Sequence, residues 1–221
     1  VVVGVGPDVP ARPGPARFRR KFGVQGSFAI YVGRIDESKG CKDLFEYFRR
    51  YVANVSGTMS LVLVGTSALP VPSHPRIRNL GGVSDADRFD AMAASDLLII
   101  PSHVESLSIV AIEAWALGKP VVANGRCDVL KGQCIRSDAG LYYENYAEFA
   151  EALFTLQTNP RLRAALGANG RAFFRRHYAW SVIERRYLEM IAQLKQEETA
   201  LRRHRVEPLP SWLARRLRTV A

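Results

Sequence analysis

The sequence holds only three cysteines and four histidines in 221 residues, and its apolar runs are short. Three sparse cysteines cannot build a disulfide framework, and a chain of this length buries enough core to fold without one. No run approaches the roughly 18 apolar residues that a membrane-spanning helix needs. No basic segment followed by an apolar one and a cleavage site marks a secretory signal. We therefore expect a cytoplasmic protein whose thiols stay reduced.

Groups that bind metals or act as histidine-based catalysts are equally scarce. Cys127 and Cys134 lie seven residues apart with no histidine near them in the sequence, so they form no zinc motif. Only His103 follows an apolar run, which leaves no histidine-based triad to assemble. Gly4 and Gly6 start no dinucleotide-binding fingerprint, because prolines rather than a helix follow them. We expect neither a metal ion nor a cofactor.

The sequence carries an excess of positive charge, with 31 Lys and Arg against 21 Asp and Glu. The excess is confined to residues 11–21 and 201–221, and basic and acidic residues are equal in number elsewhere. A balanced body gives no reason to expect a nucleic-acid partner. The C-terminal cluster, around Trp212, fits peripheral contact with an anionic membrane on its cytoplasmic face.

Short apolar runs alternate with helical patterns through most of the chain. The runs at residues 28–32, 61–64, 97–100 and 121–123 lack polar alternation, as strands buried on both faces do. Segments between them place apolar residues at helical spacing, most clearly from Leu44 to Val52. This order predicts an α/β fold, a Rossmann-like doubly wound parallel sheet with helices on both faces. Further helices are expected over residues 85–94, 107–117 and 146–156, and for most of 160–205.

Composition divides the chain into four parts. Prolines between Pro7 and Pro15 block helix formation and make residues 1–20 a connector, and the sheet domain follows over residues 21–178. Residues 179–205 are expected to form a C-terminal helix, and residues 206–221 a basic amphipathic tail. Because the chain opens on apolar residues, like the end of a strand, and without Met, we expect a fragment of a longer polypeptide.

The loop after the first predicted strand is rich in charge. It runs from Gly33 to Gly40 and places two cations, Arg34 and Lys39, five residues apart just before a helix. A planar guanidinium, a point charge and helix amides together suit a diphosphate. The alternative is a solvated turn in which Arg34 pairs locally with Asp36.

Two glutamates mark the segment after the strand at residues 97–100. Glu105 lies in a loop and Glu113 lies two turns into an otherwise apolar helix, where a carboxylate is costly to bury without a partner. Vicinal hydroxyls of a ribose or hexose are suitable partners. The backbone amides of Leu107, Ser108 and Ile109, at the start of that helix, suit a phosphate. The alternative is a capping residue and a half-exposed helix face.

A third loop, Leu80-Gly81-Gly82-Val83, follows a short predicted strand. Paired glycines allow a planar base to approach the backbone closely. The alternative is that these glycines only satisfy the geometry of a strand-to-helix turn.

Four segments of the sequence, taken in order, resemble one enzyme family. They are Val32-Gly33-Arg34 with Lys39-Gly40, Leu80 to Val83, Pro101-Ser102 with Glu105 to Glu113, and Gly118 to Val122. The resemblance is to the C-terminal donor-binding domain of family 4 retaining GT-B glycosyltransferases. It implies that Arg34 and Lys39 hold the diphosphate and stabilise the leaving nucleotide, that Glu105 contacts the donor sugar, and that Glu113 takes the ribose hydroxyls. The donor-binding residues it implies are Gly33, Arg34, Lys39, Leu80, Gly81, Val83, Glu105, Ser106, Leu107, Ser108, Ile109 and Glu113.

The same resemblance implies a retaining hexosyltransferase that uses a nucleoside-diphosphate sugar such as a UDP or GDP sugar. Such enzymes carry the acceptor site in an N-terminal domain, so this chain would be the donor-binding half and inactive alone. Residues 1–20 would then be the interdomain linker, and the helix over residues 179–205 would return toward the missing domain. A GT-B-like epimerase and a non-catalytic nucleotide-sugar-binding module are the alternatives. Two departures stand out: Ser106 and Ser108 replace the family's usual glycines, and residues 124–127 read Asn-Gly-Arg-Cys rather than a Thr-Gly-Gly turn.

Overall fold

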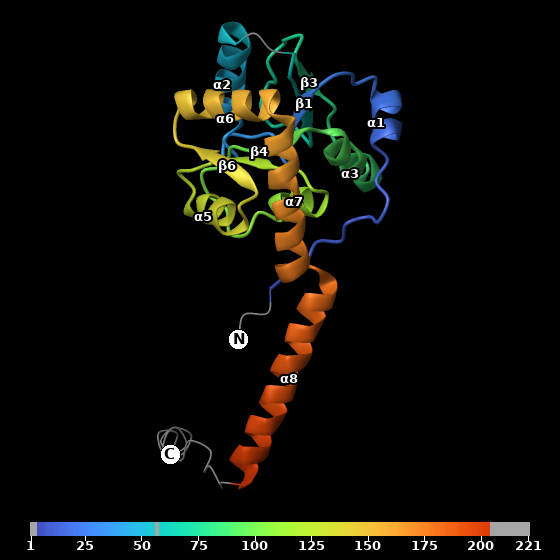
Figure 1. Cartoon of the computed structure of the whole chain (residues 1–221), viewed down its shortest axis with the longest axis vertical. Helices are drawn as coiled ribbons and strands as arrows, with labels where there is room; N and C mark the ends of the chain where they lie inside the picture. Colours follow the sequence, from blue (N-terminus) through green and yellow to red (C-terminus); the bar gives the residue numbers. More distant parts are fainter. Residues whose placement is uncertain (1–3, 56–57, 204–221) are drawn as a thin grey trace, which may run out of the picture. The chain divides into compact units, whose positions relative to one another are not determined.

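The computed structural model describes residues 4–55 and 58–203, with side chains described as far as residue 197. The described residues fall into two compact units, one of residues 6–179 and one of residues 4–5 with 180–203. The first unit holds the sheet, and the second consists mainly of helix α8, Trp180–Arg203 (Figure 1). The expected basic tail over residues 206–221 lies outside the described residues.

The first unit is built on one parallel sheet of six strands. The strands are β1 Phe28–Val32, β2 Ser60–Val64, β3 Ile77–Asn79, β4 Leu97–Ile100, β5 Val121–Asn124 and β6 Gly140–Tyr143. Their order in the sheet is β3-β2-β1-β4-β5-β6, so the chain leaves β1 toward one edge and returns to β4 on the other side of β1. The loops after β1 and β4 diverge at this reversal, which is where open α/β sheets bind ligands.

Helices cover both faces of the sheet (Figure 1). One core holds side chains of α1 Pro15–Phe22, α3 Asp85–Ala94, α4 Ile109–Ala116 and α5 Asp128–Ser137, and the other holds those of α2 Cys41–Asn54 and α6 Tyr146–Thr158. Helix α7, Pro160–His177, contributes to both. Successive residues of β1 divide between the cores, with Phe28 and Ile30 in the first and Ala29 and Tyr31 in the second. The predicted doubly wound α/β fold is therefore confirmed.

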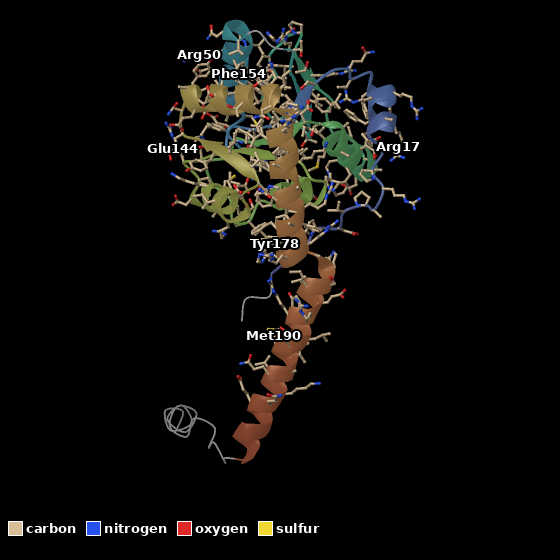
Figure 2. All side chains as sticks on the ribbon, in the orientation of Figure 1. Arg17, Arg50, Glu144, Phe154, Tyr178 and Met190 are labelled. Atoms are coloured by element: carbon tan, nitrogen blue, oxygen red, sulfur yellow. The ribbon has the colours of Figure 1, made fainter. Side chains whose placement is uncertain are left out.

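The structure differs from the sequence-based boundary at residue 20. Residues 15–22 form helix α1, which packs against α3 (Figure 1). This packing buries the Phe18 side chain. Pro15 occupies the first turn, where a missing N–H costs no hydrogen bond, so the proline begins this helix instead of preventing it. Arg17, labelled in Figure 2, donates through Nε and Nη2 to the buried Asp90 carboxylate of α3. The expected connector therefore includes a helix that belongs to the sheet domain.

Two further elements were not predicted, helix α5 and strand β6. Strand β6 lies at the edge of the sheet, and only Tyr143 of its four residues is fully buried. Its sequence, Gly-Leu-Tyr-Tyr, therefore lacks the continuous apolar character that identified the inner strands. Helix α4 also begins later than expected, at Ile109 rather than Leu107.

Helices α4 and α7 pack so closely that glycine is required at one position. A Cβ atom built on Gly167 of α7 would lie 2.1 Å from the carbonyl oxygen of Gly118, which follows α4. We expect Gly167→Ala to lower the free energy of unfolding by about 1–3 kcal/mol, because the backbone must shift to relieve this overlap. Urea unfolding followed by circular dichroism measures the change.

Gly132→Ala is the matched control. A Cβ atom on Gly132 in helix α5 meets only the flexible end of Arg136, at 2.9 Å. This variant should be neutral or stabilised by about 0.5–1 kcal/mol through alanine's helix propensity. Equal effects of the two substitutions would contradict the packing argument.

Candidate functional site

The candidate site lies where the loops after β1 and β4 face each other. A cavity of about 200 Å³ opens there, next to the N-terminus of helix α4. Among its lining residues are Gly33 and Lys39 from the first loop and Ser102, Glu105 and Ser108 from the second. Tyr31, Val32, Ile99, Ile100, Ile109 and Val110 complete the lining. The residues that follow two strands distant in sequence therefore share one cavity.

The loop after β1 is held in shape by Asp36. Its carboxylate accepts hydrogen bonds from the Ser38 hydroxyl at 2.8 Å and the Lys39 amide at 2.9 Å, and it also pairs with Arg34. The bond from Ser38 is the largest effect that holds the pKa of Asp36 below its usual range. Tyr31, whose pKa is raised by burial, donates its neutral hydroxyl to the Arg34 carbonyl oxygen at 2.6 Å. The backbone before Lys39 is thereby fixed.

Arg34 and Lys39, the two cations expected to hold a diphosphate, lie in different surroundings. The Arg34 side chain is 66% exposed, forms the local pair with Asp36, and does not line the cavity. Lys39 lines the cavity, and its ammonium contacts Glu105 Oε1 at 2.8 Å. The structure therefore brings Lys39 and Glu105 together and leaves Arg34 beside them, with its guanidinium accessible.

The Lys39–Glu105 ion pair joins the loops that follow β1 and β4. Its lysine side chain is 37% exposed and its glutamate side chain 15% exposed. An anionic ligand in the cavity would compete with Glu105 for the ammonium. A carboxylate released in this way becomes a hydrogen-bond acceptor for hydroxyl groups.

Glu113 is buried, and its partner is Arg88, a residue that no sequence motif indicated. Arg88 of α3 donates from Nη1 to Glu113 Oε2 at 2.5 Å, and its Nε contacts Asp85 at 3.2 Å. Burial is the largest single effect on Arg88 and lowers its pKa, but the hydrogen bonds and charges of Glu113 and Asp85 outweigh it, so the pKa is raised. The pair spans two helices, and no sequence spacing indicated it.

The loop expected to read a base lies beside β3 and outside the cavity lining. Gly81 has φ +68, and a Cβ atom there would meet nothing within 4 Å, so the backbone faces open space. Its amide donates to Asn79 Oδ1 at 3.0 Å, and its carbonyl accepts from Gly65 N at 2.8 Å. Leu80 and Val83 pack partly against the core. Neither Glu113 nor this loop lines the cavity.

The loops after β4 and β5 are tied together by Asn124. Its Nδ2 donates to the Pro101 carbonyl at 3.1 Å and lies 3.2 Å from His103 Nδ1. His103 Nε2 contacts Asp43 of α2 at 3.0 Å. The first residue of the Asn-Gly-Arg-Cys segment, which replaces the family's usual turn, therefore fixes the loop that leads to Glu105.

The described part of the chain contains neither a cluster of metal ligands nor a helix suited to span a membrane. Across the side chains of residues 4–55 and 58–197, no group of three or more His, Cys, Asp or Glu is arranged to hold a metal ion. Across residues 4–55 and 58–203, no helix combines the length and the apolar character needed to cross a bilayer.

Comparison with known proteins identifies the fold and the family. Residues 16–173 match the family described as glycosyl transferases group 1. A D-inositol 3-phosphate glycosyltransferase from Frankia alni is 32% identical over 209 residues, which cover 83% of this chain and 50% of that protein. A GDP-mannose-dependent monoacylated α-(1-6)-phosphatidylinositol monomannoside mannosyltransferase from Corynebacterium glutamicum is 29% identical, covering 78% of this chain and 49% of that protein. The chain thus spans about half the length of these relatives.

A solved structure has the same fold. The Anabaena protein HepE in complex with UDP-glucose superposes with a TM-score of 0.67 at 22% identity, covering 81% of this chain and 52% of that one. At this identity the likeness concerns the fold alone.

A double-mutant cycle tests whether Arg88 and Glu113 act as a pair. We expect Arg88→Met and Glu113→Leu each to cost about 2–3 kcal/mol, because each leaves a largely buried charge without its partner. The double variant should cost less than the sum, since two apolar side chains replace both charges. Urea unfolding of the four proteins measures the coupling.

The exposed pair Lys42–Glu37, with side chains 59% and 70% exposed, is the control. Its cycle should give a coupling of about 0.5 kcal/mol or less. Additive effects of Arg88→Met and Glu113→Leu would show that the two charges are not coupled.

Proposed function

Because this chain belongs to the family of glycosyl transferases group 1, we propose that it is the donor-binding half of a retaining hexosyltransferase of family 4 and that it binds a nucleoside-diphosphate sugar. The observation that carries the proposal is the shared cavity, in which Lys39, Glu105 and the N-terminus of α4 meet at the reversal of the sheet. Helix amides and an ammonium group are donors only, which suits an acceptor-rich diphosphate.

The proposed chemistry is stabilisation of a leaving nucleoside diphosphate. As the sugar bond breaks, negative charge grows on the diphosphate, and Lys39, Arg34 and the amides at the start of α4 are placed to neutralise it. In this proposal no metal ion is needed for that task. Glu105, once separated from Lys39 by the diphosphate, accepts hydrogen bonds from sugar hydroxyls.

Glu113 is proposed to hold the ribose. Arg88 occupies Oε2, and the other oxygen of the carboxylate serves the vicinal hydroxyls. Arg88 orients the carboxylate through its hydrogen bond to Oε2, so we propose it as a positioning residue. The open backbone at Gly81 is proposed to face the base.

The acceptor is proposed to bind an N-terminal half that this chain does not include, so the chain alone is inactive. Helix α8 supports this division, because Tyr187, Ile191 and Leu194 place exposed apolar side chains at helical spacing. We propose that this stripe packs on the other half of the enzyme.

Nucleotide binding is tested by thermal unfolding with UDP, GDP and ADP in parallel, since one similar protein is GDP-mannose-dependent and another was solved with UDP-glucose. A nucleotide at about 100 times its dissociation constant should stabilise the chain by about 2.7 kcal/mol, which raises the unfolding midpoint by about 5–10 °C. Lys39→Met should weaken binding about tenfold or more, because a charge-assisted hydrogen bond is lost.

Lys42→Met is the matched control, since Lys42 pairs with Glu37 at the surface outside the cavity. Its nucleotide affinity should equal that of the wild type. No shift with any of the three nucleotides, or equal losses in the two variants, would contradict the proposed donor site.

Membrane contact through residues 206–221 is a further part of the proposal. It rests on the arginines and Trp212 of that sequence, and one relative's name includes a phosphatidylinositol acceptor. Sedimentation with phosphatidylglycerol vesicles should fall when residues 206–221 are deleted and when salt is raised. Phosphatidylcholine vesicles are the control, and unchanged sedimentation after the deletion would remove this part of the proposal.

A further inference from the structure

Ser108 has a backbone conformation that serine rarely adopts. Its φ is 53° and its ψ 75°, in the left-handed region, and among the described residues Asp138 is the other non-glycine with a positive φ. This conformation is unfavourable for a residue with a Cβ atom, and glycine adopts it freely. Ser108 is the residue just before helix α4, where a strained serine needs an explanation.

The hydroxyl of Ser108 is buried without a hydrogen-bond partner. The residue is 6% exposed, and Oγ is one of two buried side-chain polar atoms in the described part of the chain that lack a partner. It makes no capping hydrogen bond to the first turn of α4 either. Buried polar atoms are nearly always paired in native proteins, so an unpaired one points to a missing ligand.

Ser108 lies at the cavity of the candidate site. Ser108 lines it together with Gly33, Lys39 and Glu105. The amides of Ile109 and Val110 at the start of α4 have no partner inside the helix, because the first turn of a helix leaves N–H groups free, whereas the Ala111 amide donates to the Ser108 carbonyl oxygen at 3.1 Å. A hydroxyl, free amides and an ammonium group therefore converge as donors on one small space. An acceptor-only group such as a phosphate satisfies all of them.

We propose that the Ser108 hydroxyl donates a hydrogen bond to a phosphate oxygen of the bound nucleoside diphosphate. Serine is kept at a position that suits glycine because its hydroxyl binds the ligand. This inference rests on the proposed donor site, and it adds a side-chain contact that a glycine at this position cannot make.

Two variants of the full chain separate the hydroxyl from the backbone. Ser108→Ala removes the hydroxyl and keeps the strained conformation, whereas Ser108→Gly removes both. Neither should unfold at a lower temperature than the wild type without ligand, because an unpaired buried hydroxyl stabilises nothing. Both should bind the nucleotide that stabilises the wild type, UDP or GDP, about tenfold or more weakly by calorimetric titration.

Ser95→Ala is the matched control, because it replaces another buried serine of the sheet domain. Ser95 is buried like Ser108, but its hydroxyl donates to the Met92 carbonyl oxygen at 2.8 Å, outside the cavity. This variant should lose stability and keep the nucleotide affinity of the wild type. The expected pattern is therefore opposite for the two serines, and a general effect of replacing a buried serine cannot produce it.

Three other outcomes would overturn the hydroxyl contact, its assignment to the phosphate, or the donor site itself. Wild-type affinity in Ser108→Ala, whether or not Ser108→Gly binds weakly, shows that the hydroxyl makes no contact, while the donor site itself stands because the wild type binds. A loss seen with UDP-glucose or GDP-mannose but not with UDP or GDP places the hydroxyl on the sugar and overturns the phosphate contact. Failure of the wild type to bind any of these ligands overturns the donor site, and the Ser108 contact with it.

Discussion

The pairing of β1 with β4 is the constraint on which the site depends. Ala29 and Ile30 of β1 lie opposite Leu97 and Leu98 of β4, although more than sixty residues separate them in the chain. Parallel strands end at the same edge of a sheet, so the loops that follow these two strands emerge side by side. Lys39 and Glu105 can form an ion pair for this reason. Sheet topology, rather than any local motif, brings the charges together.

Each of the three cationic side chains discussed for the candidate site forms an ion pair with a carboxylate. Arg34 pairs with Asp36, Lys39 with Glu105 and Arg88 with Glu113. Such pairing lowers the cost of holding charges in partly buried positions. It also means that a diphosphate does not meet bare cations. In the proposed donor site the ligand takes over the Lys39–Glu105 pair, whose two residues line the cavity, and we propose that binding of the diphosphate and release of Glu105 are one event.

The sequence was sufficient for the features that depend on local pattern. Apolar runs identified β1, β2, β4 and β5 because these strands are buried on both faces, and the charged loops were located because they follow such runs directly. Edge strand β6, which is only partly buried, left no such pattern. Arg88 could not be assigned to Glu113, since the two side chains meet only when α3 and α4 pack on the same face. The sequence indicated that a buried Glu113 needs a partner and suggested sugar hydroxyls, whereas the structure shows that Arg88 donates to its carboxylate.

Backbone contacts set the precision of the site, and they explain why glycines surround it. A Cβ atom on Gly40 would lie 2.2 Å from the Pro101 carbonyl oxygen, and one on Gly65 would lie 1.9 Å from that of Gly33. The loop after β1 is thus clamped between the ends of β2 and β4 at distances that only glycine permits. Lys39 precedes Gly40 directly, so main-chain contact fixes the point from which its side chain reaches Glu105. At Gly40 and Gly65 the close backbone contacts explain why the residue has no side chain. At Ser108 the backbone conformation favours glycine, so it is the presence of a side chain that requires an explanation.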